Sequence, residues 1–372
     1  MKFELPTTVY QEKGCVKNHA KELAAFGKHA FIITGKSSSK KNGSLQDVCD
    51  ALTTEQVRYT IFDEIEENPS VETCKRAAEI GLQEKVDFCI GIGGGSPLDA
   101  SKAIALLLGN DTLDTDIFYE PERARKEAIP VVCVPTTAGT GSEVTPYAIL
   151  TLHEKHTKKS ISHRIFPKMA LCDASYLAFV PFNTLKNTAI DALAHLIESY
   201  LNSNTDMYNR MFAEYGLKQW GKVKDALTDL SLTEEDFELL MEIATIAGMA
   251  ISHTATSIPH GLSYPVTYEL GVPHGAACGI FLPGYLFFCM KQEAMESKPL
   301  SSAMTRKDTE AIFEMLGVKG IEEFAKMLYT MLGDISIKEE LWQKDVDLLM
   351  ENPAKLKNCP YQITREELES FI

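Results

Sequence analysis

Several features that mark other protein classes are missing from this 372-residue sequence. Its nine cysteines are odd in number and contain no Cys-x-x-Cys pair. Cys89 and Cys133 lie inside apolar runs, where a reduced thiol packs as a small hydrophobe, so a reducing cytoplasm is the simplest interpretation. No apolar run approaches the ~20 residues of a membrane span, and the first residues lack the apolar core of a signal peptide, so we expect neither. There are no repeats and no low-complexity tracts.

Basic charge is also scarce. Lys and Arg number 37 against 52 Asp and Glu, a formal net charge of −15. This balance argues against nucleic acid or an anionic membrane surface as the main partner, and an anionic substrate would need a local positive site. The length predicts two domains, and 45% apolar with 24% charged residues is typical of soluble globular proteins.

The first half alternates short apolar runs with helical patterns, which predicts an α/β domain with a parallel sheet. The predicted strands are 30–34, 58–62, 86–92 and 129–134, and the predicted helices are 46–52, 71–83 and 97–108, the last with Pro97 at its first position. From Thr184 the pattern is nearly all helical, with breaks near 202–206, 261–275, Pro299 and 352–353. We therefore predict a dinucleotide-binding α/β domain over 1–177 and an all-α domain over 178–372.

Two turns follow predicted strands of this sheet. Gly93-Gly-Gly-Ser-Pro-Leu-Asp99 joins a strand to a helix, an arrangement that cradles phosphate because glycines let the backbone approach and the helix N-terminus offers free N–H groups. The order differs from the Rossmann GxGxxG, and a glycine turn without a ligand is the alternative. The second turn is rich in hydroxyls, from Thr136 to Ser142. In a parallel sheet both turns emerge at the carboxyl edge, where ligands bind.

Four residues of the second half form a candidate metal site: Asp191, His195, His260 and His274. Asp191 and His195 are four residues apart in a helical pattern, which places both side chains on one face. One carboxylate and three imidazoles suit a divalent first-row metal and leave a position open for water or substrate. Taken alone, an Asp/His pair at this spacing also occurs as a surface pair or capping contact.

Together these motifs resemble the iron-containing (group III) alcohol dehydrogenases, over about residues 5–370. The resemblance implies an α/β cofactor domain, a helical domain, and a metal and active site in the cleft between them. It implies iron as the usual metal, although three imidazoles and a carboxylate also accept zinc. The cofactor-binding residues that it implies are Gly94, Gly95, Ser96, Asp99, Thr136, Thr137, Thr140, Ser142 and Lys158 (or Lys159), to which we add Gly35 and Ser38.

The sequence departs from the family pattern in two places. Tyr264 stands four residues after His260, where many members have a histidine near the nicotinamide, so Tyr264 and His274 are our catalytic candidates. The loop Gly35-Lys-Ser-Ser-Ser-Lys-Lys41 lacks the acid with which NAD-preferring members bind ribose. Family usage favours NADH, but this loop would tolerate the 2′-phosphate of NADPH.

The segment from His260 to His274-Gly looks most like the branch that reduces sulfoacetaldehyde or phosphonoacetaldehyde to the corresponding alcohol. For the anionic tail we predict contacts from His253, Thr254 and Ser257, on a helix leading to His260, with Arg164 or Lys357 assisting. Alternatively, these hydroxyls bond back to helix carbonyls.

Other activities stay open at this stage. A general short-chain alcohol dehydrogenase acting on butanol, 1,3-propanediol or lactaldehyde has the same motifs. A lyase resembling dehydroquinate synthase would need more basic residues, and a metal scaffold would not need a dinucleotide cradle. The alternating segment Lys2–Tyr10 reads as an edge strand, and family members pair such strands, so we expect a homodimer.

Overall fold

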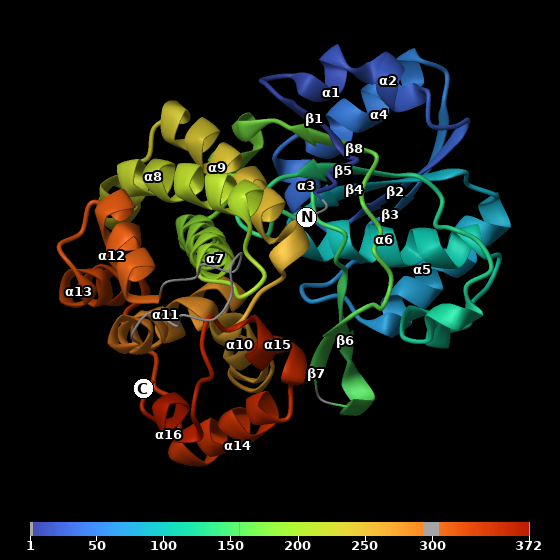
Figure 1. Ribbon diagram of the computed structural model, residues 1–372. Coiled ribbons are helices and arrows are strands. Elements are labelled where there is room, and N and C mark those ends of the chain that lie inside the picture. Colours follow the sequence, from blue (N-terminus) through green and yellow to red (C-terminus); the bar gives the residue numbers. More distant parts are fainter. Residues whose placement is uncertain (1–2, 156, 293–304, 372) are drawn as a thin grey trace. The chain divides into compact units, whose positions relative to one another are not determined.

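The computed structural model describes residues 3–155, 157–292 and 305–371 and divides the chain into two compact units (Figure 1). One unit is Glu4–Pro181, and the other runs from Phe182 to the C-terminal end of the chain, with Phe3 packed into it. The division falls where the first long helix of the second unit begins, whereas the sequence placed it at 177/178. Pro299, a predicted break, lies outside the described residues.

The first unit contains a six-stranded parallel sheet in the order β1-β8-β5-β4-β2-β3 and a separate antiparallel pair, β6 and β7. Its strands are β1 (Thr8–Gln11), β2 (His29–Thr34), β3 (Arg58–Phe62), β4 (Phe88–Gly93), β5 (Val131–Pro135), β6 (Ile149–Leu152), β7 (Thr157–Ser160) and β8 (Met169–Cys172). Its helices are α1 (Cys15–Asn18), α2 (Ala20–Ala24), α3 (Ser38–Lys41), α4 (Ser44–Thr54), α5 (Val71–Glu84) and α6 (Gly95–Gly109), with 3-10 turns η1 (Thr115–Phe118), η2 (Pro121–Arg123), η3 (His153–Lys155) and η4 (Ala174–Phe179).

Helices cover both faces of this sheet. Along β2, Phe31 and Ile33 point into the core beneath α5 and α6, whereas Ala30 and Ile32 point into the core beneath α1, α2 and α4. Successive residues of a strand face opposite sides, so burial of both faces requires an unbroken apolar run. This is why the apolar runs predicted the central strands, and the predicted α/β parallel fold is confirmed.

The glycine turn joins β4 to α6. Gly93 has φ 146, which favours glycine, and an added Cβ would lie 2.7 Å from Pro97 Cγ. α6 begins at Gly95, so Pro97 is its third residue. The prediction that Pro97 is the first residue of this helix is wrong. A proline still fits there because the first four N–H groups of a helix have no intrahelical partner. Thr136 N–H donates to Gly93 O at 2.9 Å, so the two predicted turns lie together at the carboxyl edge.

The second unit is helical throughout its described residues. Its helices are α7 (Phe182–Tyr200), α8 (Met207–Asp229), α9 (Glu234–Thr254), α10 (Ile258–Leu270), α11 (His274–Lys291), α12 (Thr305–Leu316), α13 (Ile321–Leu332), α14 (Glu339–Met350), α15 (Pro353–Asn358) and α16 (Arg365–Glu369). Every residue from Ala189 to Tyr200 is buried, and α7 packs against α8, α9, α10 and α11. A helix buried on all sides is normally apolar, so its buried Asp191, His195 and Glu198 mark a site of function.

Two expectations about the helical unit are wrong. The predicted break over 261–275 is confined to 271–273, because α10 continues through Pro265 while its buried face packs on α11 and α14. Tertiary packing here outweighs the cost of a proline inside a helix. The single helix expected to lead into His260 is instead broken: Ala255 has φ 56, and α9 and α10 are bent by 109°.

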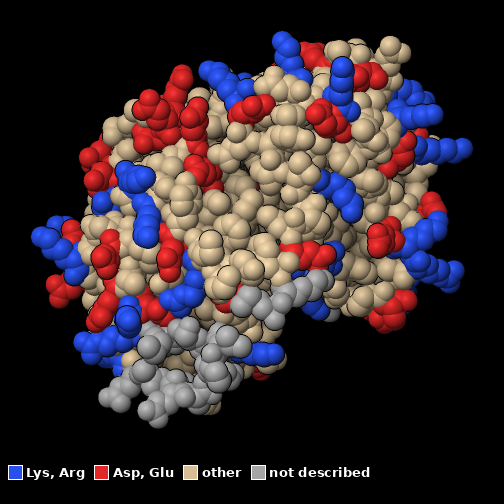
Figure 2. Space-filling view, turned by 45° about the horizontal axis from the view of Figure 1, so that its top comes forward, with Lys and Arg blue, Asp and Glu red and all other residues tan. Residues whose placement is uncertain are grey.

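Charges of both signs occupy the surface. On the face shown in Figure 2, acidic and basic side chains are interspersed. Within the described part of the chain, no single helix has the length and apolar composition to cross a membrane. Together α9 and α10 meet that test of length and composition, but as a sharply bent pair.

Candidate active site

The four predicted ligands converge inside the helical unit. α7 carries Asp191 and His195 one turn apart, His260 lies in the first turn of α10, and His274 opens α11. Asp191 Oδ1 lies 3.4 Å from His260 Nε2, 3.7 Å from His274 Nε2 and 3.9 Å from His195 Nε2. Donors bonded at about 2.0–2.2 Å to a tetrahedral ion lie about 3.3–3.6 Å apart, so one ion can bridge them after small shifts.

The glycine after His274 is what lets α11 approach α7. A Cβ added at Gly275 would lie 1.9 Å from the carbonyl oxygen of Asn187 and 3.0 Å from Asp191 Cβ. Any side chain at this position would push the start of α11, and His274 with it, away from Asp191. Glycine is therefore required after His274 for a steric reason, the close approach of α11 to α7.

Asp191 Oδ1 and His260 Nε2 are among the buried atoms of this cluster that have no hydrogen-bond partner in the described part of the chain. Their side chains are only 3% and 2% exposed. Burial alone would raise the pKa of Asp191, but His195, His274 and His260 hold it well below its usual range. Burying a carboxylate oxygen and an imidazole nitrogen without hydrogen bonds is costly, and a cation bound between the two atoms would remove that cost. The residues present thus fit a divalent first-row metal.

Behind the cluster, Glu198 holds His260 from two sides. Its Oε2 lies 2.5 Å from His260 Nδ1, and its Oε1 accepts the backbone N–H of His260 at 2.9 Å. Burial would raise the pKa of Glu198, but His260 and Lys355 lower it. A carboxylate on the second nitrogen fixes the tautomer that presents Nε2 to a metal. Glu198 was missed from the sequence, although it is seven residues after Asp191 and hence on the same helix face.

Tyr264 lies next to His274, and Lys355 lies next to Tyr264. The half-buried ring of Tyr264 is stacked on that of His274 with centroids 5.7 Å apart at 19°. Lys355 Nζ lies 5.4 Å from the centroid of the Tyr264 ring and is hydrogen-bonded to Thr256 Oγ1. The ammonium therefore lies against the phenol ring that stacks on the imidazole of a candidate ligand. The sequence offered no signal for Lys355, which belongs to the distant helix α15.

The three predicted substrate contacts have partners of other kinds. The ring of His253 stacks on Phe3 at 4.6 Å. The Thr254 hydroxyl is buried and bonds to two backbone carbonyl oxygens of its own segment, at 3.0 and 3.3 Å. Ser257 is fully buried and its hydroxyl donates to the carbonyl of Lys355 at 3.4 Å. Thr254 matches the alternative in which a hydroxyl bonds back to its own helix, whereas Ser257 bonds to α15, and a role of these residues toward substrate stays a prediction.

In the other unit, the hydroxyl-rich turn packs onto the glycine turn. A Cβ added at Gly94 would lie 3.0 Å from Thr137 Oγ1, and one at Gly95 would lie 2.7 Å from Thr140 Cγ2. With Gly94 as the N-cap of α6, the free N–H groups of the first turn follow directly. A phosphate approaching these groups finds backbone where any larger residue would intrude.

A hydrogen bond between Asp99 and Ser142 connects the glycine turn and its helix to the hydroxyl-rich turn. Asp99 Oδ1 accepts the Ser142 hydroxyl at 2.5 Å, and Oδ2 accepts the N–H of Ile149 at 2.8 Å. Burial raises the pKa of Asp99, with Lys102 acting against this. The fully buried Lys102 donates to Ser142 Oγ and to the carbonyl of Tyr147, both at 2.7 Å. These contacts brace the turns, and direct contact of Asp99 or Ser142 with a cofactor stays a prediction.

Four further cofactor candidates lie near the same edge of the sheet. Ser96 Oγ accepts the backbone N–H of Asn68 at 3.0 Å, and Lys158 Nζ donates to Asn68 Oδ1 at 2.7 Å, so both approach one asparagine. Gly35 directly follows β2, the strand beside β4. Ser38 begins α3, in the same loop region.

Comparison with known proteins decides the family. Residues 6–174 match the family described as iron-containing alcohol dehydrogenase, and residues 186–372 match the C-terminal domain of the Fe-containing alcohol dehydrogenase family. The chain belongs to the iron-containing alcohol dehydrogenases. It is therefore an oxidoreductase that acts on alcohols or aldehydes, which sets aside the lyase and the metal scaffold.

Relatives of this dehydrogenase carry several substrate names. The NADPH-dependent butanol dehydrogenase of Clostridium saccharobutylicum is 27% identical over 394 residues, covering 100% of this chain and 97% of the relative. An iron-containing alcohol dehydrogenase structure from Thermotoga maritima is 33% identical, with a TM-score of 0.89 and coverage of 100% and 98%. The NAD+ complex of sulfoacetaldehyde reductase from Bifidobacterium kashiwanohense is 26% identical, with a TM-score of 0.84 and coverage of 99% and 96%.

The contact of Glu198 with His260 predicts a measurable loss in this dehydrogenase. Glu198→Gln removes the charge but keeps the volume, so His260 loses the partner that orients it. We expect metal affinity to fall about 10–100-fold, the usual effect of losing such a partner. Titration against a competing chelator measures this, with Glu238→Gln on the exposed face of α9 as the control. Unchanged metal affinity in a normally folded Glu198→Gln variant would show that the contact is only structural.

Proposed function

We propose that this dehydrogenase reduces a two-carbon aldehyde with an anionic tail, sulfoacetaldehyde or phosphonoacetaldehyde, using a reduced nicotinamide dinucleotide and a divalent metal. The observation that carries the substrate class is the ammonium of Lys355 beside Tyr264, whose ring stacks on His274, in a chain of net charge −15. A sulfonate or phosphonate that leaves water needs a cation or strong donors close by. The similarity to a sulfoacetaldehyde reductase supports the same class.

The roles of the residues follow from their positions. When bound, the metal supplies Lewis acidity to the carbonyl oxygen of the substrate, and the nicotinamide supplies the hydride. Asp191 and the three histidines hold the ion, through a donor set that suits iron and zinc alike. The phenol of Tyr264, stacked against His274, is the group of this chain that would give a proton to the developing alkoxide.

The loop after β2 bears on the choice of dinucleotide. It contains Lys36, Lys40 and Lys41 and no acid, and Lys40 is paired with Asp63 at the end of β3. Family usage favours NADH, while a loop without an acid also accommodates the 2′-phosphate of NADPH. Assays with both dinucleotides, followed by the absorbance of the reduced nicotinamide, decide between them.

A panel of aldehydes tests the substrate class. We expect kcat/KM to be higher for sulfoacetaldehyde or phosphonoacetaldehyde than for butanal, because only the anionic tails can use Lys355. The second candidate is a general short-chain alcohol dehydrogenase, which the similarity to a butanol dehydrogenase favours. Higher efficiency on butanal would support that candidate and overturn the anionic substrate.

Removing the Lys355 charge separates binding of the tail from the chemistry. Lys355→Gln should lower kcat/KM on the anionic aldehyde by about 10–150-fold, since a hydrogen bond to a charged group contributes about 1.5–3 kcal/mol. On butanal the variant should differ little from wild type. Lys326→Gln, an exposed lysine of helix α13, is the matched control. Equal losses on both aldehydes would mean that Lys355 supports the site rather than the tail.

We also propose a cytoplasmic homodimer. All nine cysteines lie among the described residues, where they are buried and form no disulfide, as in a reducing compartment. β1 is an edge strand of the sheet and pairs only with β8 among the described strands, which leaves its other side for a partner strand. Light scattering should give twice the chain mass of 41.3 kDa, and activity should fractionate with the cytosol. A monomer mass at micromolar concentration would refute the dimer.

A further inference from the structure

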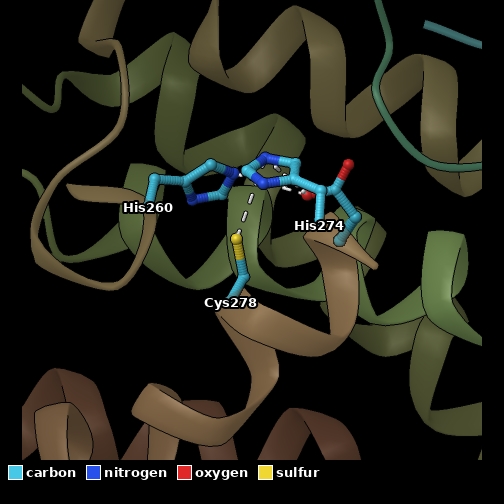
Figure 3. Close-up of side chains that lie close together, drawn as sticks. His260, His274 and Cys278 are labelled. Carbon is cyan, nitrogen blue, oxygen red and sulfur yellow. Dashed lines mark hydrogen bonds and ion pairs between the residues drawn. The ribbon is translucent and has the colours of Figure 1, made fainter. Parts of the chain in front are cut away.

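A cysteine that the predicted ligand set does not include lies at the metal cluster. Cys278 follows His274 by one turn of α11, and its Sγ lies 3.9 Å from His274 Nε2 (Figure 3). One donor atom from each of Asp191, His260, His274 and Cys278 can be chosen so that all four lie within 4.8 Å of one another. The thiol is fully buried and points toward the imidazoles of His260 and His274, as Figure 3 shows.

We propose that Cys278 is a direct ligand of the metal, and that Asp191, His260, His274 and Cys278 form a second four-donor set alongside the set that contains His195. The inference rests on the metal centre of the proposed function and adds a thiolate donor, Cys278, to that centre. Thiolate is a soft ligand that favours zinc, whereas imidazole and carboxylate serve iron and zinc alike. The thiol thus gives this chain a way to hold Zn²⁺ tightly.

The distances agree with direct coordination. Bonds of about 2.3 Å to sulfur and about 2.0–2.1 Å to nitrogen place the two atoms about 3.6 Å apart around a tetrahedral ion. The observed 3.9 Å needs a shift of a few tenths of an ångström. Asp191 Oδ1 and His260 Nε2, which are buried and have no hydrogen-bond partner among the residues that the structure describes, are the independent sign that an ion belongs between these side chains.

Helix geometry explains why this thiol reaches the centre. His274 and Cys278 are four residues apart in α11 and therefore share a face. Gly275 lets the same turn approach α7 at Asn187, so the shared face meets Asp191. On binding, the S–H bond breaks, a sulfur–metal bond forms, and the proton leaves to the solvent, so the ion keeps its oxidation state.

Cobalt substitution tests this coordination without any assay of activity. Metal-free protein is loaded with Co²⁺, and its near-ultraviolet spectrum is searched for the thiolate-to-cobalt charge-transfer band. We expect the band in wild type and in Cys289→Ala, which removes another buried thiol of α11. Cys278→Ala should bind Co²⁺ but lose the band. Its Zn²⁺ affinity should fall by at least about 10–100-fold, because removing a residue that only hydrogen-bonds to a metal ligand already costs that much. Its Fe²⁺ affinity should fall less.

The outcomes separate this inference from the proposed function. A stoichiometric Co²⁺ complex of wild type without the band, or a band that survives in Cys278→Ala, overturns Cys278 as a ligand and leaves the metal centre intact. A wild-type protein that binds neither Co²⁺, Zn²⁺ nor Fe²⁺ overturns the metal centre and the thiolate ligand together. If Cys278→Ala fails to fold, Cys278→Ser with the same spectrum decides, since a hydroxyl cannot produce the sulfur band.

Discussion

Asp191→Ala is expected to lower kcat/KM by about 10²–10⁴-fold and to strip most of the metal from the purified protein. Asp191 Oδ1 is the atom from which all three histidine nitrogens lie 3.4–3.9 Å, and its charge is the only one in the predicted ligand set. Polarising a carbonyl by a bound metal contributes several kcal/mol, and each 1.36 kcal/mol is a factor of ten in rate. Metal content by elemental analysis and steady-state rates measure both effects.

The control is Asp225→Ala, which removes an exposed acid of α8 and should change neither metal content nor rate. Asp191→Asn keeps the side-chain volume, so it separates loss of the ligand charge from loss of packing. An Asp191→Ala protein with full metal content and full turnover would remove Asp191 from the centre.

Gly94→Val should remove cofactor binding while leaving the metal in place. A Cβ at Gly94 already comes within 3.0 Å of Thr137 Oγ1, so valine would fill the space that a pyrophosphate needs. Overpacking costs about 1–3 kcal/mol and a lost hydrogen bond to a charged phosphate about 1.5–3 kcal/mol. Together these predict a loss of NAD(P)H affinity of about 100-fold or more, measured by titration of nicotinamide fluorescence.

Metal content is the internal control for this variant, because the predicted ligands all belong to the helical unit. Gly94→Ala, with one methyl group, should show a smaller loss in the same direction. Unchanged affinity for NADH and NADPH in both variants would show that the glycine turn only shapes the fold.

A local pattern was enough to place Asp191 beside His195, because helix spacing sets their relation. Asp191 and His195 are four apart on α7, and the rule that placed them on one face also applies to Glu198, three residues further. Cys278 follows His274 by four residues on α11, the same spacing as that between Asp191 and His195. Both could have been found in the sequence by continuing along the helix face from the predicted ligands.

Other parts depended on tertiary contacts that no local pattern carries. Lys355 reaches Tyr264 from α15, which is far away in the sequence. The break between α9 and α10 depends on the backbone at Ala255, a residue with no turn signal, and Pro265 lies inside a helix because α10 is packed on its neighbours. In the sheet, by contrast, continuous apolar runs predicted β2, β4 and β5, which are buried along their whole length, while the short interior strand β8 was not predicted.

Reconstitution of the metal-free enzyme tests the central claim most directly. After removal of metal by a chelator, oxidation of NADH or NADPH by sulfoacetaldehyde should fall to the background rate. It should return after stoichiometric Fe²⁺ or Zn²⁺ is added, and it should not return in Asp191→Ala. Full activity of the metal-free protein, or recovery that does not need Asp191, would contradict a metal-dependent reductase built on this cluster.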